Sequence, residues 1–175
     1  TAGYQVMLLD IKESILETQK VHIEKNLELF HQSGLISKQD IEASLKRLHT
    51  TLDLEEAVEN SDFIVESIPE ELELKQEVFE QVESLCKKDA VKATNTSSLT
   101  LKDIGIRVKD KSRLVVTHWF NPPHIVPTVE VVKGDYTSDE TMEIAYQLLQ
   151  KAQKMPVKLN FELPGFLINR IQIAL

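Results

Sequence analysis

The sequence predicts an α/β protein with a doubly wound, mostly parallel sheet, and three observations support this fold class. Short, continuous apolar runs such as residues 4–10 and 63–68 are typical of strands that are buried on both faces. The segments between such runs carry apolar residues at three- and four-residue steps, as amphipathic helices do. Clusters of polar residues follow several of the runs, at the strand ends where sheets of this class bind ligands.

The first elements form a strand and a helical arm. A strand over residues 4–10 precedes a helix from Ser14 to Phe30, which Gly34 ends. A second helix over residues 37–48 begins with Ser37, and the acid three residues later makes a loose capping box. Strands and helices then alternate. The later expected elements are a short strand and a brief helix within 50–62, strands over 63–68, 89–98, 113–120, 125–132 and 155–159, and helices over 70–86, 99–108 and 138–151.

The chain is predicted to hold one domain and the beginning of another. Pro164 and Gly165 mark the boundary, so residues 1–161 form the α/β domain and 162–175 form a linker and the first helix of an all-α domain. The N-terminus has neither Met nor a charged leader, and the last residues stop inside an apolar pattern. Both ends therefore read as interruptions of a longer chain.

Composition argues against several classes of partner. The net charge is −8, which repels a phosphate backbone, and no stretch approaches the roughly 18 apolar residues of a membrane span. The single cysteine, Cys86, cannot form an internal disulfide and reads as an inert thiol in a cytoplasmic protein. No metal site is expected, because the four histidines other than His118 lack the spacing of metal ligands. Three of them are expected on the arm helices, namely His22, His31 and His49, and the fourth is His124.

Two polar positions at strand ends are candidates for ligand binding. Asp10 ends the first strand, where a Rossmann fold places an acid that accepts hydrogen bonds from an adenosine ribose and disfavours a 2′-phosphate. A solvated or helix-capping aspartate is the alternative. Ser97 and Ser98 end another strand, where a hydroxyl can bind a substrate oxygen, although either serine could instead cap the next helix.

His118 and Glu130 form the most informative pair. His118 ends an apolar strand, Asn121-Pro122-Pro123 reverses the chain, and Glu130 lies among valines in the next strand. A reversal near Pro123 places residue 118 opposite residue 128, with Glu130 as the diagonal neighbour on the same face. A glutamate among valines is costly to bury without a donor, and such a carboxylate can orient an imidazole as a general base. A structural histidine is the alternative.

At this point the residues resemble the L-3-hydroxyacyl-CoA dehydrogenase family from about Gly3 to the end. The stretches "AGYQVMLLD", "FIVESIPEELELKQEVF", "NTSSL", "HWFNPP", "VEVV" and "PGFLINR" match successive family motifs in order and at near-family spacing. The resemblance identifies the chain as an N-terminal NAD-binding domain without its glycine loop.

The resemblance implies an NAD-dependent oxidation of a 3-hydroxyl group to a ketone, as in fatty acid β-oxidation or butanoate metabolism. His118 would be the base, Glu130 its orienting carboxylate, Ser97 the partner of the reacting oxygen, and Asn169 a contribution from the second domain. In the cofactor site the implied residues are Asp10 on the ribose, Glu70 and Lys75 in contact with NAD, and Asn95 in support of the same loop.

The resemblance leaves the substrate open. Trp119 replaces the commoner phenylalanine, and "NPPHIVP" is closer to branches that act on carnitine or gulonate, or to the structural lambda-crystallins. The arm positions that contact coenzyme A in the family fall near Asn26 and Ser33. The resemblance implies that the full-length protein is a homodimer. These 175 residues alone are expected to be inactive, because the family's first strand and glycine loop precede the position of Gly3.

Overall fold

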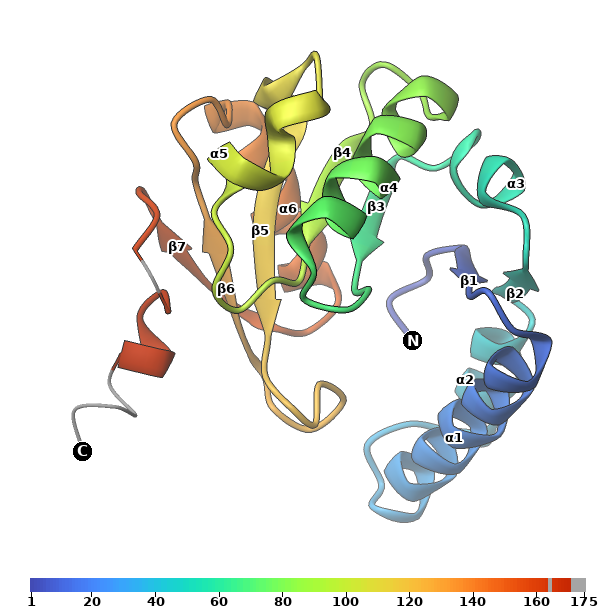
Figure 1. Ribbon diagram of the computed structural model, residues 1–175. Coiled ribbons are helices and arrows are strands. Elements are labelled where there is room, and N and C mark those ends of the chain that lie inside the picture. The colour runs from blue at the N-terminus through green and yellow to red at the C-terminus, as the bar shows by residue number, and fades with distance from the viewer. Residues whose placement is uncertain (164, 171–175) are drawn as a thin grey trace. The chain divides into compact units, whose positions relative to one another are not determined.

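The structure, a computed structural model, describes residues 1–163 and 165–170 (Figure 1). It comprises two compact units, one of residues Thr1–Ala57 and one that begins at Val58. The α/β class predicted from the sequence is confirmed, since helices flank a mostly parallel sheet in the second unit and a parallel strand pair in the first.

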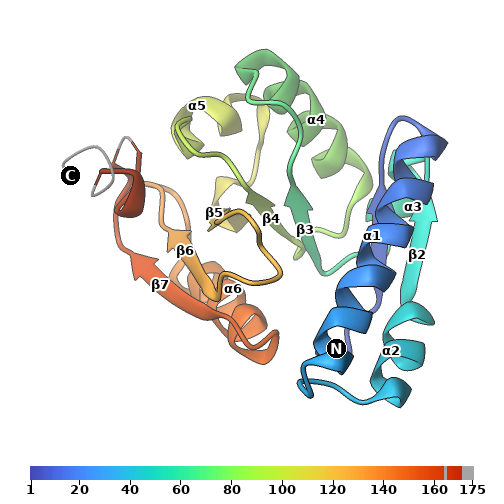
Figure 2. The same cartoon turned by 90° about the horizontal axis from the view of Figure 1, so that it is seen from below.

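The first unit is built from two strands and a helical arm. Its strands pair in parallel, with Val6 opposite Leu48, and the two arm helices lie side by side in both views (Figure 1, Figure 2). The predicted capping box is present, because the Ser37 hydroxyl accepts from the Asp40 N–H and the Asp40 carboxylate accepts from the Ser37 N–H. The elements in order are β1 (Val6–Leu9), α1 (Glu13–Gln32), α2 (Lys38–Leu45), β2 (Leu48–Thr51) and α3 (Leu54–Val58).

Two expectations for the first unit are wrong. The first strand is not buried on both faces: within this unit β1 pairs only with β2, and Val6 remains 47% exposed. His49 does not lie on an arm helix, because α2 ends at Leu45 and the backbone at residue 49 pairs with Met7 as part of β2. The His49 side chain is nevertheless exposed, as expected of a surface residue.

The second unit holds a five-stranded sheet in the order β3-β4-β5-β6-β7. The first three strands are parallel, β6 runs antiparallel to β5, and β7 is parallel to β6. The single reversal follows from the short connection around Pro122 and Pro123, which is too short for a parallel crossover. The elements are β3 (Phe63–Glu66), α4 (Leu72–Leu85), β4 (Val91–Thr94), α5 (Leu101–Ile104), β5 (Leu114–Trp119), β6 (Thr128–Val132), α6 (Asp139–Lys151) and β7 (Met155–Leu159).

Helices cover both faces of this sheet, with α4 and α5 on one face and α6 on the other (Figure 1, Figure 2). Successive residues of β5 serve opposite faces: Leu114 and Val116 join the core beneath α4 and α5, whereas Val115 joins the core beneath α6. Because both faces are covered, β4 is buried throughout and β5 is buried up to His118, which agrees with the apolar run at the start of β5.

The C-terminal segment is described through Arg170, except for residue 164. The described residues Ile168–Arg170 are helical, in agreement with the expected new helix, whereas Pro164 and the predicted continuation beyond Arg170 lie outside the described residues. The domain boundary at 161/162 therefore stays a prediction. In the part of the chain that the structure describes, no helix combines the length and apolar character that a membrane span requires.

Candidate active site

His118 and Glu130 form a buried hydrogen-bonded pair. The two residues lie directly opposite each other in the antiparallel β5–β6 pair, and His118 Nδ1 is 2.7 Å from Glu130 Oε2. The expected diagonal placement is wrong, because the reversal centres on residue 124 and not on Pro123. In this reversal the N–H groups of Ile125 and Val126 both donate to the Pro122 carbonyl. The predicted pairing of the imidazole with the carboxylate is confirmed, and direct opposition makes it closer than expected.

The environment of Glu130 keeps it ionised. Burial raises the pKa of this carboxyl group. The hydrogen bonds from the His118 ring and from the N–H groups of Ile168 and Leu167 lower the pKa by more than burial raises it, so that the net shift is downward. Those two N–H groups lie 3.0 and 2.9 Å from Oε1. Glu130 is 0% exposed and therefore depends wholly on these donors for solvation.

The charge on Glu130 fixes the state of the imidazole. An ionised carboxylate only accepts hydrogen bonds, so Nδ1 carries a proton, and in the neutral ring Nε2 is then the acceptor. No hydrogen bond to Nε2 is present among residues 1–163 and 165–170. The ring is held between Phe120, at a centroid distance of 4.7 Å, and Phe166, at 5.3 Å. These contacts fix the orientation of the imidazole ring beside Glu130.

A third group fastens the loop that bears the predicted serines. Glu70 Oε1 accepts from Thr96 Oγ1 at 2.5 Å, from the N–H groups of Ser97 and Ser98 at 3.0 and 3.1 Å, and from Ser98 Oγ at 3.0 Å. Desolvation raises the pKa of Glu70, but these donors and the Lys75 ammonium outweigh it and lower the pKa to about 2.

The two serines differ in what their hydroxyls do. The Ser98 hydroxyl is bound to Glu70, whereas the Ser97 side chain is exposed and has no hydrogen bond within the described residues. Neither serine caps α5, because Thr100 is the cap and its hydroxyl accepts from the Asp103 N–H. The structure thus leaves the Ser97 hydroxyl available to a ligand.

Lys75 and Asn95 make protein contacts next to this loop. The Lys75 ammonium is buried and lies 2.7 Å from Glu66 Oε1, 3.2 Å from the Ile68 carbonyl and 3.3 Å from Glu70 Oε2. The Asn95 side-chain oxygen accepts from the Trp119 N–H at 2.9 Å, which ties the end of β4 to the residue after His118. Asn169 follows directly on Ile168, whose N–H donates to Glu130.

Asp10 belongs to the first unit and is considered there alone. It follows β1, and its Oδ1 accepts only from the Lys12 N–H, at 3.2 Å. Among the described residues the second carboxylate oxygen has no partner, so Asp10 has acceptor positions that fit the two hydroxyl donors of a ribose. The end of a parallel strand is also the place where dinucleotide folds put this acid.

Sequence reasoning missed three features. Glu66 is a buried acid in a strand, and the cost of burying it was the available signal. Lys154 donates to the Val126 carbonyl at 3.0 Å and to that of Pro123, and so holds the loop after His118; burial lowers its pKa. Nothing in the local sequence indicates that long-range contact.

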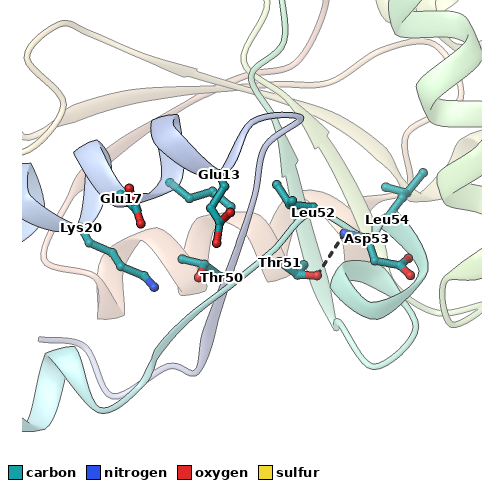
Figure 3. A pocket seen from close by; sticks show the side chains of 9 residues that line it. Glu13, Glu17, Lys20, Thr50, Thr51, Leu52, Asp53 and Leu54 are labelled. Carbon is teal, nitrogen blue, oxygen red and sulfur yellow. Dashed lines mark hydrogen bonds between the residues drawn. The ribbon is translucent and has the colours of Figure 1, made fainter.

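The third missed feature is a pocket of about 690 Å³ in the first unit (Figure 3). Figure 3 shows its lining side chains on α1 and on the turn from β2 into α3, where Thr51 Oγ1 accepts from the Asp53 N–H. Three carboxylates face one ammonium there, those of Glu13, Glu17 and Asp53 against Lys20. This negative balance is unsuited to a phosphate group, and none of the predicted site residues lines the pocket.

Two further predictions concern cysteine and metals. Burial raises the pKa of the Cys86 thiol, which keeps it protonated and agrees with the prediction of an inert thiol. Within residues 1–163 and 165–170 there is no group of three or more His, Cys, Asp or Glu side chains that could hold a metal ion.

The fold defines a Rossmann-like dinucleotide-binding domain, with polar groups at the ends of its strands. A sequence model described as "3-hydroxyacyl-CoA dehydrogenase, NAD binding domain" matches residues 1–162. The chain belongs to the 3-hydroxyacyl-CoA dehydrogenase family, and NAD is the cofactor of the domain.

Individual relatives cover several activities. The crystal structure of 3-hydroxybutyryl-CoA dehydrogenase from Escherichia coli K12 superposes with a TM-score of 0.92 at 32% identity, over 97% of this chain and 36% of that one. L-carnitine dehydrogenase of Streptomyces coelicolor is 39% identical over 133 residues, which are 76% of this chain and 42% of that protein. A human lambda-crystallin homolog is 30% identical over 176 residues, covering 100% of this chain and 55% of that protein. The chain thus spans about half or less of these relatives.

Proposed function

We propose that the protein containing this chain oxidises the 3-hydroxyl group of a 3-hydroxyacyl-CoA to a ketone, with NAD as the cofactor. The observation that carries the proposal is the buried His118–Glu130 pair, in which Nδ1 is 2.7 Å from the carboxylate and Nε2 remains an acceptor. Family membership and the similarity to a 3-hydroxybutyryl-CoA dehydrogenase support the substrate class.

In the proposed reaction, His118 Nε2 takes the proton of the 3-hydroxyl group. When bound, NAD supplies the acceptor for the hydride that leaves C3. The imidazole becomes positively charged as the proton arrives, and Glu130 stabilises this charge across the short contact to Nδ1. The ketone and one proton are the remaining products, so atoms and charge balance.

The other predicted residues take supporting roles in the same proposal. The exposed Ser97 hydroxyl donates to the reacting oxygen, and Asn169 completes the site beside the turn that binds Glu130. Asp10 binds the adenosine ribose. Glu70 and Lys75 remain predicted cofactor contacts, but the Lys75 ammonium group already has two hydrogen bonds and an ion pair with oxygens of the protein, which favours an indirect role for the lysine.

A second candidate activity is the oxidation of a small hydroxy acid that carries no coenzyme A. The 39% identity to an L-carnitine dehydrogenase favours it, as does Trp119 in the loop after His118. A structural role like that of a crystallin is a third possibility, which the complete set of His118, Glu130, Ser97 and Asn169 disfavours. A homodimer, a cytoplasmic location and a place in fatty acid or butanoate oxidation remain predictions.

The test is a comparison of substrates with the protein expressed together with the sequence that flanks residues 1–175 in its gene. We expect NADH to form with 3-hydroxybutyryl-CoA at a higher kcat/KM than with carnitine or gulonate. His118→Ala is expected to lower kcat by about 10²–10⁴-fold with little change in NAD affinity. Turnover of carnitine or gulonate alone would establish the second activity, and an unchanged rate in His118→Ala would exclude the histidine as base.

A further inference from the structure

Two buried charges lie beneath the serine loop and have no role in the reaction described above. Glu66 ends β3 and is 6% exposed, and Lys75, in α4, is 1% exposed. Glu66 Oε1 accepts from Lys75 Nζ and from the Ile68 N–H, both at 2.7 Å, while Oε2 accepts from Thr94 Oγ1 at 2.7 Å. Both carboxylate oxygens of Glu66 are therefore occupied by protein donors.

Lys75 joins this carboxylate to a second one. Its ammonium group lies between Glu66 Oε1 and Glu70 Oε2, at 2.7 and 3.3 Å. A buried ammonium group needs such partners, because desolvation of an unpaired charge costs several kcal/mol. Lys75 also donates a hydrogen bond to the Ile68 carbonyl, so that its ammonium group is held by Glu66 and Ile68 through hydrogen bonds and by Glu70 through an ion pair. The position of Glu70 is thus coupled to Glu66 through one side chain.

Glu70 passes this constraint to the serine loop. Its other oxygen, Oε1, binds the hydroxyl of Thr96 and the N–H groups of Ser97 and Ser98. Glu66 accepts from the hydroxyl of Thr94, which ends β4 and lies two residues before Thr96. The segment from Thr94 to Ser98 is therefore held at both ends by carboxylates that share one ammonium group, and within the described residues Ser97 has the one hydroxyl of this segment without a hydrogen bond.

We propose that Glu66 is a positioning residue of the active site, which acts through Lys75 on Glu70 and thereby fixes the loop that presents the Ser97 hydroxyl. This inference rests on the proposed function, because Ser97 is taken to bind the reacting oxygen. It assigns Glu66 no direct contact with substrate or cofactor, and the effect of Glu66 on catalysis is confined to the orientation of one hydroxyl group. Lys75, which stays a predicted cofactor contact, is given this positioning role in addition.

The first test follows the loop itself and needs no activity. Amide hydrogen exchange of Ser97 and Ser98 is measured by NMR in the wild type, Glu66→Gln and Lys75→Met. We expect the amide exchange rates of Ser97 and Ser98 to be about tenfold higher in both variants. In these variants Glu70 loses its fixed position, and the hydrogen bonds that it accepts as a charged group weaken by about that factor. Adding Glu66→Gln to Lys75→Met is expected to have no further effect, because the connecting ammonium is already absent.

A matched control is available in the same helix. Glu83 also accepts from two backbone N–H groups, those of Lys109 and Asp110, and lies 3.5 Å from the buried Lys92 ammonium. Glu83→Gln is expected to speed exchange at Lys109 and Asp110 and to leave Ser97 and Ser98 unchanged. Unchanged exchange at both serines in Glu66→Gln and Lys75→Met, with cooperative melting retained, would overturn the proposal.

The second test is a double-mutant cycle on kcat with the flanked protein and 3-hydroxybutyryl-CoA. Glu66→Gln is expected to lower kcat about tenfold when Ser97 is present and to have almost no effect in Ser97→Ala. Equal losses in both backgrounds would make Glu66 a purely structural residue and overturn the proposal. If the wild type oxidises no 3-hydroxyacyl-CoA, the proposed function fails, while the exchange measurement still decides whether Glu66 holds the loop.

Discussion

Glu130 has two acceptor oxygens with different partners, and a change at this residue tests both. Glu130→Gln keeps the shape, but its amide can donate to His118 Nδ1 and so select the tautomer in which Nε2 carries the proton. We expect kcat to fall by about 10²–10⁴-fold, as when the orienting carboxylate of a catalytic histidine is neutralised. Steady-state kinetics with 3-hydroxybutyryl-CoA measures this loss.

The control for that substitution is Glu162→Gln. Glu162 is a second partly buried carboxylate, whose pKa burial raises and whose Oε1 accepts from the Leu101 N–H. The substitution Glu162→Gln removes an acid from the same unit and leaves the imidazole untouched. We expect kcat to stay within about twofold of the wild type, as for substitutions with a small energetic effect. A Glu130→Gln enzyme with full turnover would show that Glu130 has only a structural role.

Single residues were predictable where burial conflicted with polarity. A glutamate among valines and a histidine at the end of an apolar strand signalled a pair, and the structure brings them to 2.7 Å. The register between them was not predictable, because it depends on where the reversal is centred. Glu66 gave the same signal but was overlooked, since its partner Lys75 is nine residues away on another element.

At the scale of elements, Glu70 joins the segment before α4 to the loop after β4, and this link depends on pH. The pKa is lowered from 4.5 to about 2 in the folded protein. A depressed carboxyl pKa gives stability that is fully present above the unfolded value and is lost as pH falls towards the folded value. The contribution of Glu70 should therefore disappear between about pH 4.5 and about pH 2.

Glu70→Gln tests this pH dependence. The melting temperature of the wild type is expected to exceed that of the variant above about pH 5, and the difference is expected to shrink as pH falls to about 2, where Glu70 becomes neutral in both states. Melting is followed by circular dichroism across this range. A difference that stays constant from pH 5 to pH 2 would mean that the ionisation of Glu70 does not stabilise the fold.

Elements were predicted well where local signals act and less well where tertiary contacts decide. The Ser37–Asp40 capping box was visible in the sequence and is present, and the helix expected over residues 138–151 is α6, Asp139–Lys151. The helix expected over residues 99–108 is shorter, since α5 ends at Ile104 and continues as a 3-10 turn to Arg107. The serines were expected at the end of a strand over residues 89–98, whereas β4 ends at Thr94 and the serines lie in the loop that follows. The carboxylate that holds this loop was not predicted in that role.

For the molecule as a whole, the first unit carries Asp10, the proposed ribose-binding acid, and the second carries the His–Glu pair. This separation predicts separate kinetic effects. Asp10→Ala is expected to raise KM for NAD by about 10–100-fold, the range for hydrogen bonds to a charged group, with a smaller change in kcat. It should also relax the preference for NAD over NADP, because the repulsion of a 2′-phosphate is removed.

Asp53→Asn serves as the control in the same unit. Asp53 Oδ1 accepts from the Glu55 N–H at the start of α3, and asparagine can do the same. KM for both cofactors is expected to remain at the wild-type value. If Asp10→Ala leaves KM for NAD and the preference for NAD unchanged, Asp10 is the solvated strand-end residue of the alternative interpretation.

The fold class was predictable because alternating apolar runs and amphipathic segments admit few architectures. What could not be predicted is that the strands fall into a separate pair and a set of five, or that β1 keeps an exposed surface. Burial of a strand depends on its neighbours, and an apolar run does not specify them.

The dual attachment of Glu130 has a consequence for thermal inactivation. The same carboxylate receives the imidazole and the peptide N–H groups of Leu167 and Ile168, so the turn there and the tautomer of the histidine share one anchor. With His118 as base, mild warming that detaches this turn would let the carboxylate swing and stop turnover while the five strands are still paired. The half-life of activity on heating would then depend on the hydrogen bonds from the Leu167 and Ile168 N–H groups to Glu130, and not on the melting of the sheet.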